Sequence, residues 1–394
     1  MQTIAQSWLV LELTKSGTAL GIATALQSLP ILFLGPWGGL IADRFSKRKL
    51  LYGTQAISGI LAFILGFLIF FHWVNIWFVY VLAFALGVVK AIDNPTRQTF
   101  VVEMVSNKEL SNAIALNTIE INIARVLGPT LAGIMIVFVG IDMCFILNGI
   151  SFIAVLIALY MMNPNDLYKT PRVQKAKGQL REGFRYIQSS PAIKNTLIMM
   201  AIIGTLTYEF TVSLPLLAQF TFKGNAGTYA TLTSAMGVGS IIGGLLIANR
   251  RKTALRTLVI VALFFGLTVL AVSFSPTLVL ATVLLVIVGF CSVYFTSLGN
   301  IILQLESVPE MRGRVMALWG VAFLGSTPIG GPIVGWVGEY FGSRWGLAIG
   351  GFAALIAAGI GAMSLRKQKL KEMKITTTEI KNAEKIAEGD ERIL

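Results

Sequence analysis

Apolar residues occur along this chain in long runs that are separated by shorter polar connections. An α-helix needs about 20 mainly apolar residues to cross the hydrocarbon core of a bilayer. Besides an apolar opening stretch at residues 1–13, the runs of this kind are 18–41, 50–70, 75–92, 113–138, 141–162, 192–218, 228–248, 257–274, 277–299, 313–338 and 344–365. Counted with the opening stretch, the pattern predicts an all-α integral membrane protein with twelve transmembrane helices.

The composition narrows the class of protein further. Hydrophobic residues make up 55% of the 394 residues and charged residues only 13%, whereas about 25% of a soluble domain is charged. The single histidine and the two cysteines, Cys144 and Cys291, offer neither a metal-ligand cluster nor a disulfide framework. The sequence also lacks a G-x-x-x-x-G-K-[ST] phosphate-binding loop and a residue set for covalent catalysis. We therefore expect a membrane protein that is not an enzyme and needs no metal or cofactor.

The basic residues indicate how the chain is oriented. If the "DRFSKRK" connection is cytoplasmic, most of the 32 Lys and Arg residues fall in cytoplasmic loops, span ends and the tail, while the outer loops keep Lys15, Lys223 and Arg344. This asymmetry is typical of the positive-inside rule. The net charge of +13 is then a signal of topology and not of nucleic-acid binding. We expect a multi-pass protein of the cell membrane, with both termini of the full-length protein in the cytoplasm.

Two sequence echoes indicate an internal repeat. "GGLIADRFSKRKLL" at 38–51 is echoed by "GGLLIANRRKTALR" at 243–256, and "LGPTLAG" at 127–133 by "GGPIVGW" at 330–336. Both offsets are about 200 residues, as expected for two parallel six-helix halves. The predicted parts are an N-terminal bundle at 1–162, a cytoplasmic linker with an amphipathic helix at 163–191 and a C-terminal bundle at 192–365. Residues 366–394 are predicted to form a solvated, partly disordered cytoplasmic tail.

The same offset places the expected start of the first helix about a dozen residues before Met1. At 1.5 Å per residue, residues 1–13 cover only about 20 Å of a hydrocarbon core about 30 Å thick. We therefore expect these residues to be the outer part of a first helix that is truncated at its N-terminal end. Gln2 and Gln6 share one face of this helix, and we expect both to line a central cavity.

The stretch "GLIADRFSKRK" lies between the second and third runs. It resembles the G-x-x-x-D-[RK]-x-G-[RK]-R loop of the major facilitator superfamily, with Ser46 in place of the usual glycine. The resemblance implies that the first glycine allows close helix approach and that the acid and the bases form a cytoplasmic charge latch. A cluster of bases that only sets topology would not explain the glycine and the acid. The positions concerned are Gly39, Asp43, Arg44, Lys47 and Arg48.

Four further stretches are similar to one branch of this superfamily, the enterobactin exporters and macrolide-efflux proteins. They are "DNPTRQ" from Asp93, "NTIEINIARVLGPTLAG" from Asn117, "LREGFRY" from Leu180 and "VPEMRGRVMAL" from Val308. The resemblance runs from residue 1 to about residue 365 and implies a secondary exporter of amphipathic organic molecules, driven by proton antiport. It implies the major facilitator fold, a small-molecule substrate and no cofactor besides the proton gradient. We expect the chain to act as a monomer in the lipid bilayer, without nucleic acid.

"RVLGPTLAG", from Arg125 to Gly133, also resembles the antiporter motif of the fifth helix in that superfamily, with Ala132 replacing one glycine. The adjacent Gly128 and Pro129 favour a kink and close packing of neighbouring helices. The motif favours export. A packing kink without any bearing on transport direction is the alternative interpretation.

Ionisable groups within the predicted spans are functional candidates, because placing one at the bilayer centre costs about 2.5–3.5 kcal/mol. Glu209 lies in the seventh span, with Thr205 and Ser213 one turn away on either side. We expect these three residues to form a polar stripe that faces a cavity, and Glu209 to bind the coupling proton or a cationic part of the substrate. The alternative is a carboxylate at the outer membrane boundary.

The fifth span carries Asn117, Glu120 and Arg125 within one arc of about 140° of helix surface. Arg125 has no acid at i+4 spacing, so it must pair across helices or contact an anionic group, since an unpaired buried charge is costly. A structural Arg–Glu pair between helices is the alternative to a substrate site. At the inner end of the fourth span, Asp93 is expected to exchange partners between Arg44 and Arg97 as the inner gate opens.

Together, the residues and the resemblance favour proton-coupled export of a lipophilic drug, a macrolide or a siderophore. An importer of a polar nutrient is the first alternative, and the small number of acids and bases within the spans weighs against it. A receptor or scaffold that transports nothing is the second alternative. Such a protein would need neither the charge latch nor the charges within the spans.

Overall fold

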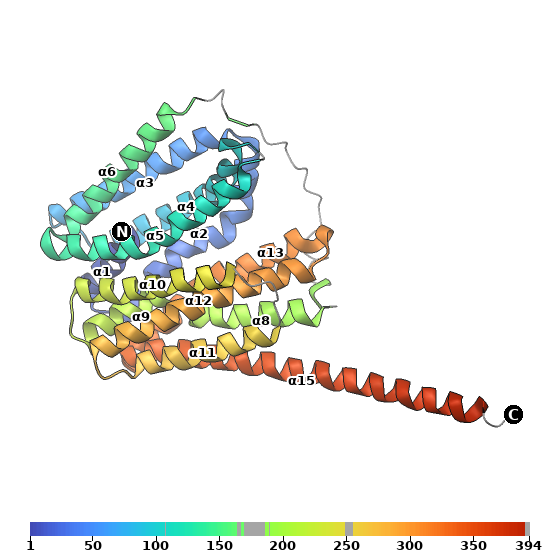
Figure 1. Ribbon diagram of the computed structural model, residues 1–394. Coiled ribbons are helices and arrows are strands. Elements are labelled where there is room, and N and C mark those ends of the chain that lie inside the picture. The colour runs from blue at the N-terminus through green and yellow to red at the C-terminus, as the bar shows by residue number, and fades with distance from the viewer. Residues whose placement is uncertain (107, 164–166, 169–185, 189, 249–254, 391–394) are drawn as a thin grey trace.

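The computed structural model describes the chain except for residues 107, 164–166, 169–185, 189, 249–254 and 391–394. The described residues form helices joined by short connections and contain no strand (Figure 1). The predicted amphipathic helix of the linker falls mainly on residues 169–185, which lie outside the described residues.

The first six helices belong to the N-terminal part of the chain. Their ends follow local sequence signals: the Ser16 hydroxyl accepts a hydrogen bond from the Ala19 N–H, and the Asn75 side chain accepts one from the Phe78 N–H, both at 3.1 Å. Gly140, with φ of 114°, reverses the chain between the fifth and sixth helices. The helices are α1 (Gln2–Thr14), α2 (Gly17–Arg44), α3 (Lys47–Phe70), α4 (Ile76–Met104), α5 (Leu110–Phe138) and α6 (Ile141–Met161).

The C-terminal part contains more helices than spans, because two of its spans are divided. Pro191 and Pro309 each stand in the first turn of a helix, where a missing N–H costs nothing. The elements are α8 (Pro191–Leu206), α9 (Phe210–Leu216), the π-helical turn η2 (Leu217–Thr221), α10 (Ala226–Ala248), α11 (Leu255–Ser273), α12 (Leu278–Glu306), α13 (Pro309–Leu324), α14 (Thr327–Tyr340) and α15 (Ser343–Asp390).

Among the described residues, 10 segments are long and apolar enough to cross a bilayer. They are α2, α3, α4, α6, the α8–α9–η2 segment, α10, α11, α12, the α13–α14 segment and α15. The remaining two helices are α1, with 13 residues, and α5, which carries the shorter apolar stretch Ile123–Phe138. These helices are consistent with the twelve predicted passes, and the prediction of an all-α membrane fold is confirmed.

The divided spans correct the expectation of continuous helices. The run 192–218 is broken at residues 207–209, and the run 313–338 is broken at residues 325–326. The breaks are short and apolar residues continue on both sides of them, so the mean hydropathy indicates one span in each case. A broken helix is tolerated within a membrane only where its freed backbone groups are buried in protein or line a cavity. The two breaks therefore point to the interior of the molecule.

The tail also differs from expectation, because it is helical where partial disorder was predicted. α15 continues from the last span to Asp390 and projects away from the other helices (Figure 1). Residues 366–388 contain no proline or glycine and are rich in Lys and Glu. These residues favour a helix even without an apolar face to pack.

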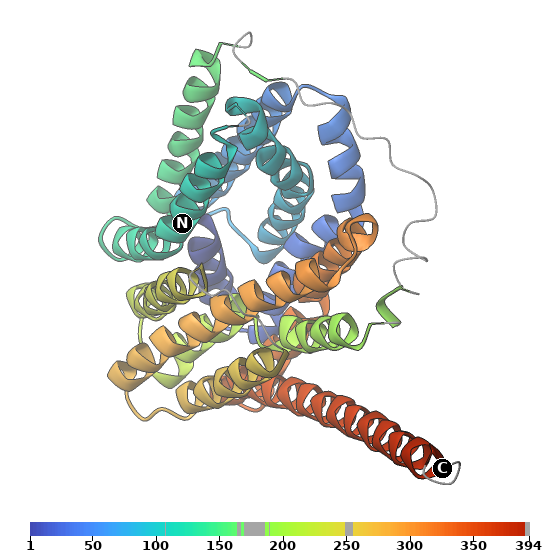
Figure 2. The same cartoon turned by 45° about the vertical axis from the view of Figure 1, so that its right-hand side comes forward.

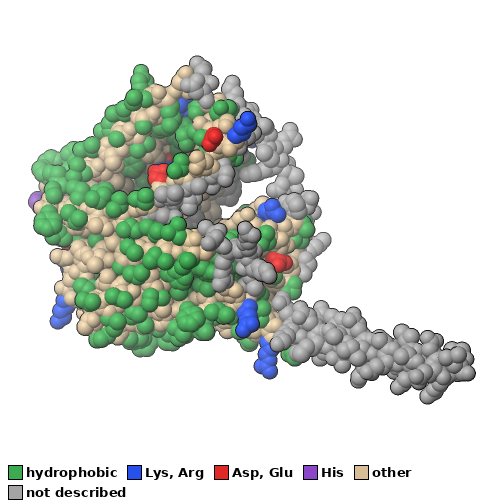
Figure 3. Space-filling view, viewed as in Figure 1, with side chains coloured by type: hydrophobic (Ala, Val, Ile, Leu, Met, Phe, Trp, Pro, Cys, Tyr) green, Lys and Arg blue, Asp and Glu red, His purple; other side chains and the backbone are tan. Residues whose placement is uncertain are grey.

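The helices form two groups that face each other (Figures 1 and 2). One group contains α2, α3, α4 and α6, and the other contains α8, α10, α11, α12 and α15. α1 lies between them and is buried from Ile4 to Leu11. The groups meet at the end that carries the α1–α2 connection, here called the closed end. They diverge at the end that carries the α2–α3 connection, the open end, where a gap separates them in Figure 3.

Glycines allow the backbones of α2 and α14 to touch at the closed end. A Cβ atom added to Gly21 would lie 2.3 Å from the carbonyl oxygen of Gly331, and one added to Gly335 would lie 2.2 Å from that of Gly17. Any larger residue at these positions would push the helices apart. Small residues four apart on each of two helices are a common basis for close packing in membranes.

The same contact is strengthened by Glu339, near the end of α14. Its Oε2 accepts hydrogen bonds from the Ser16 hydroxyl at 2.6 Å and from the Thr18 N–H at 2.8 Å. A carboxylate at a helix N-terminus satisfies free N–H groups and is favoured by the helix dipole. Glu339 thus caps α2 from the opposite group of helices, a role for which its sequence context holds no signal.

A second contact between the groups joins α5 to α10. The hydroxyls of Thr130 and Ser234 lie 2.8 Å apart, and a Cβ atom on Gly133 would lie 2.2 Å from the Cβ of Ala230. These residues lie in the half of each helix that is nearer to the closed end. The two groups are therefore held together on that side of the membrane.

Replacing Gly21 with leucine is expected to separate the closed end, because the side chain would overlap the Gly331 carbonyl. Spin labels attached through Lys15→Cys and Tyr340→Cys, both exposed residues at that end, should move apart by several ångströms. The measurement is pulsed electron resonance on the purified protein.

Gly359→Leu is the matched control, because Gly359 has no atom within 4 Å of the position of an added Cβ. It should leave the distance between the labels unchanged. Both experiments need Cys144→Ala and Cys291→Ala, since these are the two native cysteines. An unchanged distance with Gly21→Leu would mean that the α2–α14 contact does not hold this end closed.

Candidate functional site

A cavity with two lobes lies between the two groups of helices, beside the break in the seventh span. Its lobes have volumes of about 240 Å³ and 390 Å³. We call the first the acidic lobe, because Glu209 lines it, and the second the arginine lobe, because Arg125 lines it. The lining residues common to both lobes are Thr3, Tyr208, Thr211 and Phe323.

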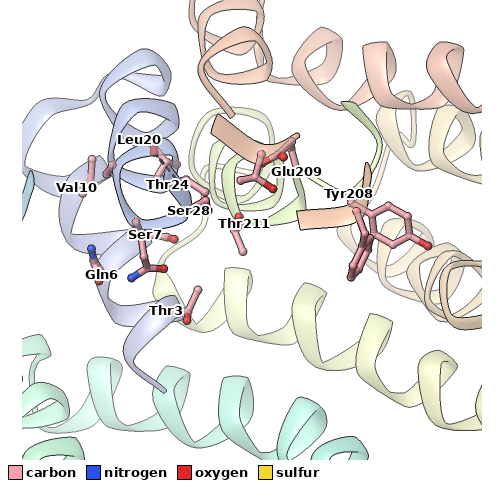
Figure 4. Close-up of a pocket in the computed structure, with 14 residues that line it drawn as sticks. Thr3, Gln6, Ser7, Val10, Leu20, Thr24, Ser28, Tyr208, Glu209 and Thr211 are labelled. Atoms are coloured by element: carbon pink, nitrogen blue, oxygen red, sulfur yellow. Dashed lines mark hydrogen bonds between the residues drawn. The ribbon is translucent and has the colours of Figure 1, made fainter. Parts of the chain in front are cut away.

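Glu209 stands at the break in the seventh span. Its carbonyl accepts hydrogen bonds from the N–H groups of Val212 and Ser213, both at 3.0 Å, and so begins α9. α8 ends just before it, where the Thr207 hydroxyl donates to the Gly350 carbonyl of α15 at 2.7 Å. As a result, the side chain of Glu209 lies beside α14, and the ring of Tyr208 points away from it (Figure 4).

The Glu209 carboxyl is only 1% exposed and lies against the first turn of α14. A Cβ atom on Gly330 would lie 3.1 Å from its Oε1, and one on Gly331 would lie 3.6 Å from its Oε2. Among the described residues, neither oxygen accepts a hydrogen bond of ordinary geometry, although the Thr327 hydroxyl is near enough to turn towards them. No described basic group lies within ion-pair distance of them.

A carboxyl group in these surroundings is suited to take up and release a proton. Burying an unpaired charge in a dry environment is expensive, which favours the neutral acid. The N-terminus of α14 and water that enters the lobe both favour the carboxylate. The protonation state of Glu209 is therefore sensitive to hydration of the cavity and to any movement of α14.

The wall of the acidic lobe opposite Glu209 is polar and comes from the other group of helices. Gln6 and Ser7 of α1, and Thr24 and Ser28 of α2, lie across the lobe from Glu209 in Figure 4. Gln6 is thus placed as expected. Gln2 is not, because its Oε1 accepts a hydrogen bond from the Asn148 amide of α6 at 3.1 Å, and it is absent from the lining of both lobes.

The predicted polar stripe along the seventh span does not form, because the helix is broken at Glu209. The Thr205 hydroxyl donates to the Ala201 carbonyl at 2.6 Å, and the Ser213 hydroxyl donates to the carbonyl of Glu209 at 3.1 Å. Both hydroxyls therefore bond to the chain's own backbone. The alternative of a carboxylate at the membrane boundary also differs from the structure, in which Glu209 lies at mid-span and is buried.

Arg125 lies on the wall of the arginine lobe, whereas the other two residues of the predicted arc do not. Asn117 and Glu120 lie further along α5, towards the open end, and belong to the lining of neither lobe. The ion pairs of the described residues involve neither Arg125 nor Glu120. The structural Arg–Glu pair considered from the sequence is therefore not formed in this part of the chain.

The "GPTLAG" residues of α5 divide between the cavity and the helix contact. Gly128 and Pro129 line the arginine lobe, and Gly133 packs against Ala230 of α10. α5 continues as one helix across Pro129. Because a proline has no N–H, the carbonyl of Arg125 loses its helical hydrogen bond, and it faces Gly237 of α10 instead.

Close approach in the "GLIADRFSKRK" stretch comes from Gly38 and not, as expected, from Gly39. A Cβ atom on Gly39 would meet no atom within 4 Å, whereas one on Gly38 would lie 2.0 Å from the Ala91 carbonyl oxygen of α4. Successive helical residues point about 100° apart, so only one of the two can face α4. Arg44 is exposed, and the side chain of Asp43 lies outside the described residues.

The bases that follow this stretch join three helix ends within one group. Lys47 forms an ion pair with Glu103 near the end of α4, an acid that the sequence analysis did not single out. Arg48 donates hydrogen bonds to the carbonyls of Leu159 and Tyr160 at the end of α6, at 2.8 and 3.0 Å. These contacts link α3, α4 and α6 at the open end.

Asp93 is 6% exposed and accepts three hydrogen bonds. The Thr54 hydroxyl and the Gln55 amide of α3 donate to its Oδ1, each at 2.7 Å, and Arg97 donates to its Oδ2 at 3.0 Å. The Arg97 side chain is 63% exposed, so this ion pair is screened by solvent and contributes little. The neutral donors of α3 therefore hold Asp93 most firmly, and Arg44 is not among its partners.

Tyr208 is the residue of the site that the sequence analysis missed. Its hydroxyl donates to the Ser292 carbonyl of α12 at 2.8 Å, and its ring meets that of Phe323 edge-on, with centroids 5.2 Å apart. These two rings stand between the lobes. Nothing in the hydropathy pattern distinguishes Tyr208 from its neighbours, and its only signal is its place beside Glu209.

The chain is similar to known membrane transporters over nearly its whole length. The profile of a family described as transmembrane secretion effectors matches residues 1–389. The staphyloferrin A transporter of Staphylococcus aureus is 24% identical over 372 residues, which cover 93% of each chain. Macrolide efflux protein A of Streptococcus pyogenes is 24% identical over 332 residues, covering 81% of this chain and 80% of the relative. The multidrug efflux pump Tap of Mycobacterium tuberculosis is 25% identical over 342 residues, covering 83% and 80%.

Solved structures with the same fold are also transporters. A bacterial homologue of the human lysosomal transporter Spinster, in an inward-facing and occupied conformation, has a TM-score of 0.73 at 14% identity over 92% of each chain. The POT family transporter PepTSo has a TM-score of 0.70 at 11% identity, covering 94% of this chain and 95% of its own. At these identities, the similarity establishes the fold alone.

The Asp93 cluster leads to a prediction about stability. Asp93→Ala should destabilise the protein by about 2–3 kcal/mol, because it leaves the buried donors of Thr54 and Gln55 without an acceptor. Arg97→Ala should cost less than about 1 kcal/mol, since the pair is exposed. Unfolding of the purified proteins in detergent, followed by circular dichroism, compares the two.

The charge swap of Asp93→Arg with Arg97→Asp checks the same explanation. It should not restore stability, because the buried position would then hold an arginine beside two neutral hydrogen-bond donors. Recovery in the double variant would instead mean that the ion pair with Arg97 is the main partner of Asp93.

Proposed function

The chain belongs to the transmembrane secretion effector family of the major facilitator superfamily, and we propose that it is a secondary transporter that exports amphipathic organic compounds in exchange for protons. Export is supported by the two relatives that are named as efflux proteins. The cavity supports an amphipathic cargo, since hydroxyl, amide, aromatic and aliphatic groups line it together.

Glu209 is the residue that carries the proposal of proton coupling. It is a buried carboxyl without a described cation beside it, at the break of one span and against the first turn of another. Half-helix ends that surround a charged group at mid-membrane are typical of ion and substrate sites in secondary transporters. We assign to Glu209 the uptake of a proton when the cavity is open to one side and its release when the cavity is open to the other.

The position of Gly331 supports a direct link between this proton and the movement of the two groups. A Cβ atom added to Gly331 would lie 3.1 Å from the Gly21 carbonyl oxygen of α2 and 3.6 Å from Oε2 of Glu209, so the same face of Gly331 meets both the acid and the closed-end contact. A change in the charge of Glu209 alters the force on the first turn of α14. The same turn must then separate from α2 before the closed end can open.

The membrane orientation is a further part of the proposal. Most loop bases lie at the open end, and the closed end keeps Lys15, Lys223 and Arg344, which supports a cytoplasmic open end in the cell membrane. Transport by a monomer is also part of the proposal. The proton gradient takes the place of a cofactor.

Glu209→Gln is expected to abolish proton-coupled efflux, because an amide keeps the shape of the acid but cannot exchange a proton. In inside-out vesicles acidified by respiration, addition of a transported compound should release protons and restore the fluorescence of a pH-sensitive dye. A panel of amphipathic compounds that includes a macrolide would be screened first with the unaltered protein. The Glu209→Gln protein should give no recovery of fluorescence.

Glu109→Gln is the control for this experiment, since Glu109 is exposed and lies outside both lobes. It should behave as the unaltered protein does. Unchanged antiport by Glu209→Gln would remove Glu209 from the mechanism. Uptake of compounds in the import direction, without any release of protons, would contradict export itself.

Cysteine labelling checks the orientation. A membrane-impermeant maleimide added to intact cells should label Lys223→Cys at the closed end but not Ser46→Cys at the open end, both in the background without native cysteines. Permeabilised cells should show labelling at both positions. The reverse pattern would place the open end outside the cell.

A further inference from the structure

We propose that the arginine lobe binds a carboxylate of the transported compound, and that Arg125 is the side chain that holds it. The proposal rests on the function proposed above, and it names a chemical class of cargo: amphipathic organic acids. It follows from the contrast between Arg125, the one charged side chain in the lining of this lobe, and the hydroxyl groups around it.

Arg125 is exposed on the wall of a cavity within the membrane-spanning part of the chain. Its guanidinium carries five N–H donors and a permanent positive charge. No described carboxylate lies within ion-pair distance of it. An uncompensated charge at this depth is expensive. An anion that enters the lobe would therefore give Arg125 the partner that the protein does not supply.

Four hydroxyl groups of the lobe already donate their protons to backbone carbonyls. The hydroxyls of Thr233, Ser240 and Thr296 donate to carbonyls of their own helices, at 2.9, 2.9 and 3.0 Å. The Tyr208 hydroxyl donates to the Ser292 carbonyl at 2.8 Å. These groups present oxygen lone pairs to the cavity, which repel a carboxylate and attract N–H or O–H groups. Among the side chains that line the lobe, Arg125 is the one that carries a positive charge.

The remainder of the lobe suits an apolar body. Its volume of about 390 Å³ lies within the range of pockets for drug-sized ligands. Phe210, Met236 and Phe323 contribute aromatic and thioether surface, which adapts to varied shapes. A cargo that fits this lining has an apolar body, at least one hydrogen-bond donor and one carboxylate.

The position of Arg125 is fixed by the backbone around it. Its own carbonyl, which Pro129 leaves without a helical partner, faces Gly237 of α10, where an added Cβ would lie 2.9 Å from the oxygen. Arg125 therefore stands where the two groups of helices touch. Its charge is separated from Glu209, which lines the other lobe beyond Tyr208 and Phe323. The anion of the cargo and the coupling proton would therefore bind in different lobes of the cavity.

Two probes that differ only in charge test the proposal: N-dansyl-phenylalanine and its amide, N-dansyl-phenylalaninamide. Each has an apolar body and a sulfonamide N–H, and only the first has a carboxylate. Binding to the purified full chain in phosphatidylcholine nanodiscs is followed by dansyl fluorescence. The acid should bind at least about tenfold more tightly than the amide, as expected for a hydrogen bond to a charged group.

Arg125→Gln should lower the affinity for the acid to that for the amide and leave the affinity for the amide unchanged. Arg125→Lys, which keeps the charge but loses the bidentate geometry, should keep part of the preference for the acid. Arg256→Gln is the matched control, because Arg256 is exposed at the start of α11 and lines neither lobe. It should keep the full preference.

The proposal is overturned if the unaltered protein shows no preference for the acid, including the case in which neither probe binds. It is also overturned if Arg125→Gln weakens both probes equally, which would indicate a packing role. The measurement needs no proton gradient, so it is independent of the test of Glu209. A preference for the acid without proton-coupled efflux would refute the proposed function alone, and efflux without this preference would refute the carboxylate site alone.

Discussion

The lipid bilayer offers no hydrogen bonds to a polypeptide backbone, and this constraint governs where the structure can depart from regular helix. In the described residues, the divided spans are the seventh and the eleventh, and the break at Thr207 and Glu209 is buried, whereas Gly325 and Ser326 are half-buried. The N–H groups of Thr207 and Tyr208 bond to the Ile203 carbonyl, and the Glu209 carbonyl accepts bonds from the first turn of α9. Because these breaks cannot face lipid, they enclose a small polar volume at mid-membrane. The side chain of Glu209 occupies that volume. The volume buries the carboxyl and makes its protonation state sensitive to hydration of the cavity.

Close helix packing at the closed end connects this volume to the arrangement of the whole molecule. The Glu209 carboxyl and the Gly21 backbone of α2 lie beside the same face of Gly331, and the absence of a side chain on Gly21 and Gly331 allows this contact. A side chain at Gly21 or Gly331 would move the Glu209 carboxyl away from the α2–α14 contact at the closed end. The tight packing of glycines therefore has a second consequence besides stability: it places a titratable group one residue away from the contact that must open during transport.

The cavity keeps its two charged residues apart. Tyr208 and Phe323 stand between the lobe of Glu209 and that of Arg125. If the two side chains were paired, each would satisfy the other and neither would be free for a proton or a cargo. In the proposed mechanism, their separation leaves a proton site beside α14 and an anion site beside α10. The two proposed sites would then move relative to each other as the groups of helices rock.

The amino-acid sequence by itself determined the membrane setting, the all-α fold and the superfamily, and it singled out Glu209 and Arg125 as candidates. These follow from hydropathy, charge and short motifs, which are properties of neighbouring residues. Only the tertiary structure decided that Gly38 and not Gly39 meets α4, that Gln2 turns to Asn148, and that the seventh span breaks at Glu209. It also decided that Arg125 has no acid partner among the described residues. Each of these depends on which helix faces a side chain, and a pattern along one chain carries no information about the distance to another helix.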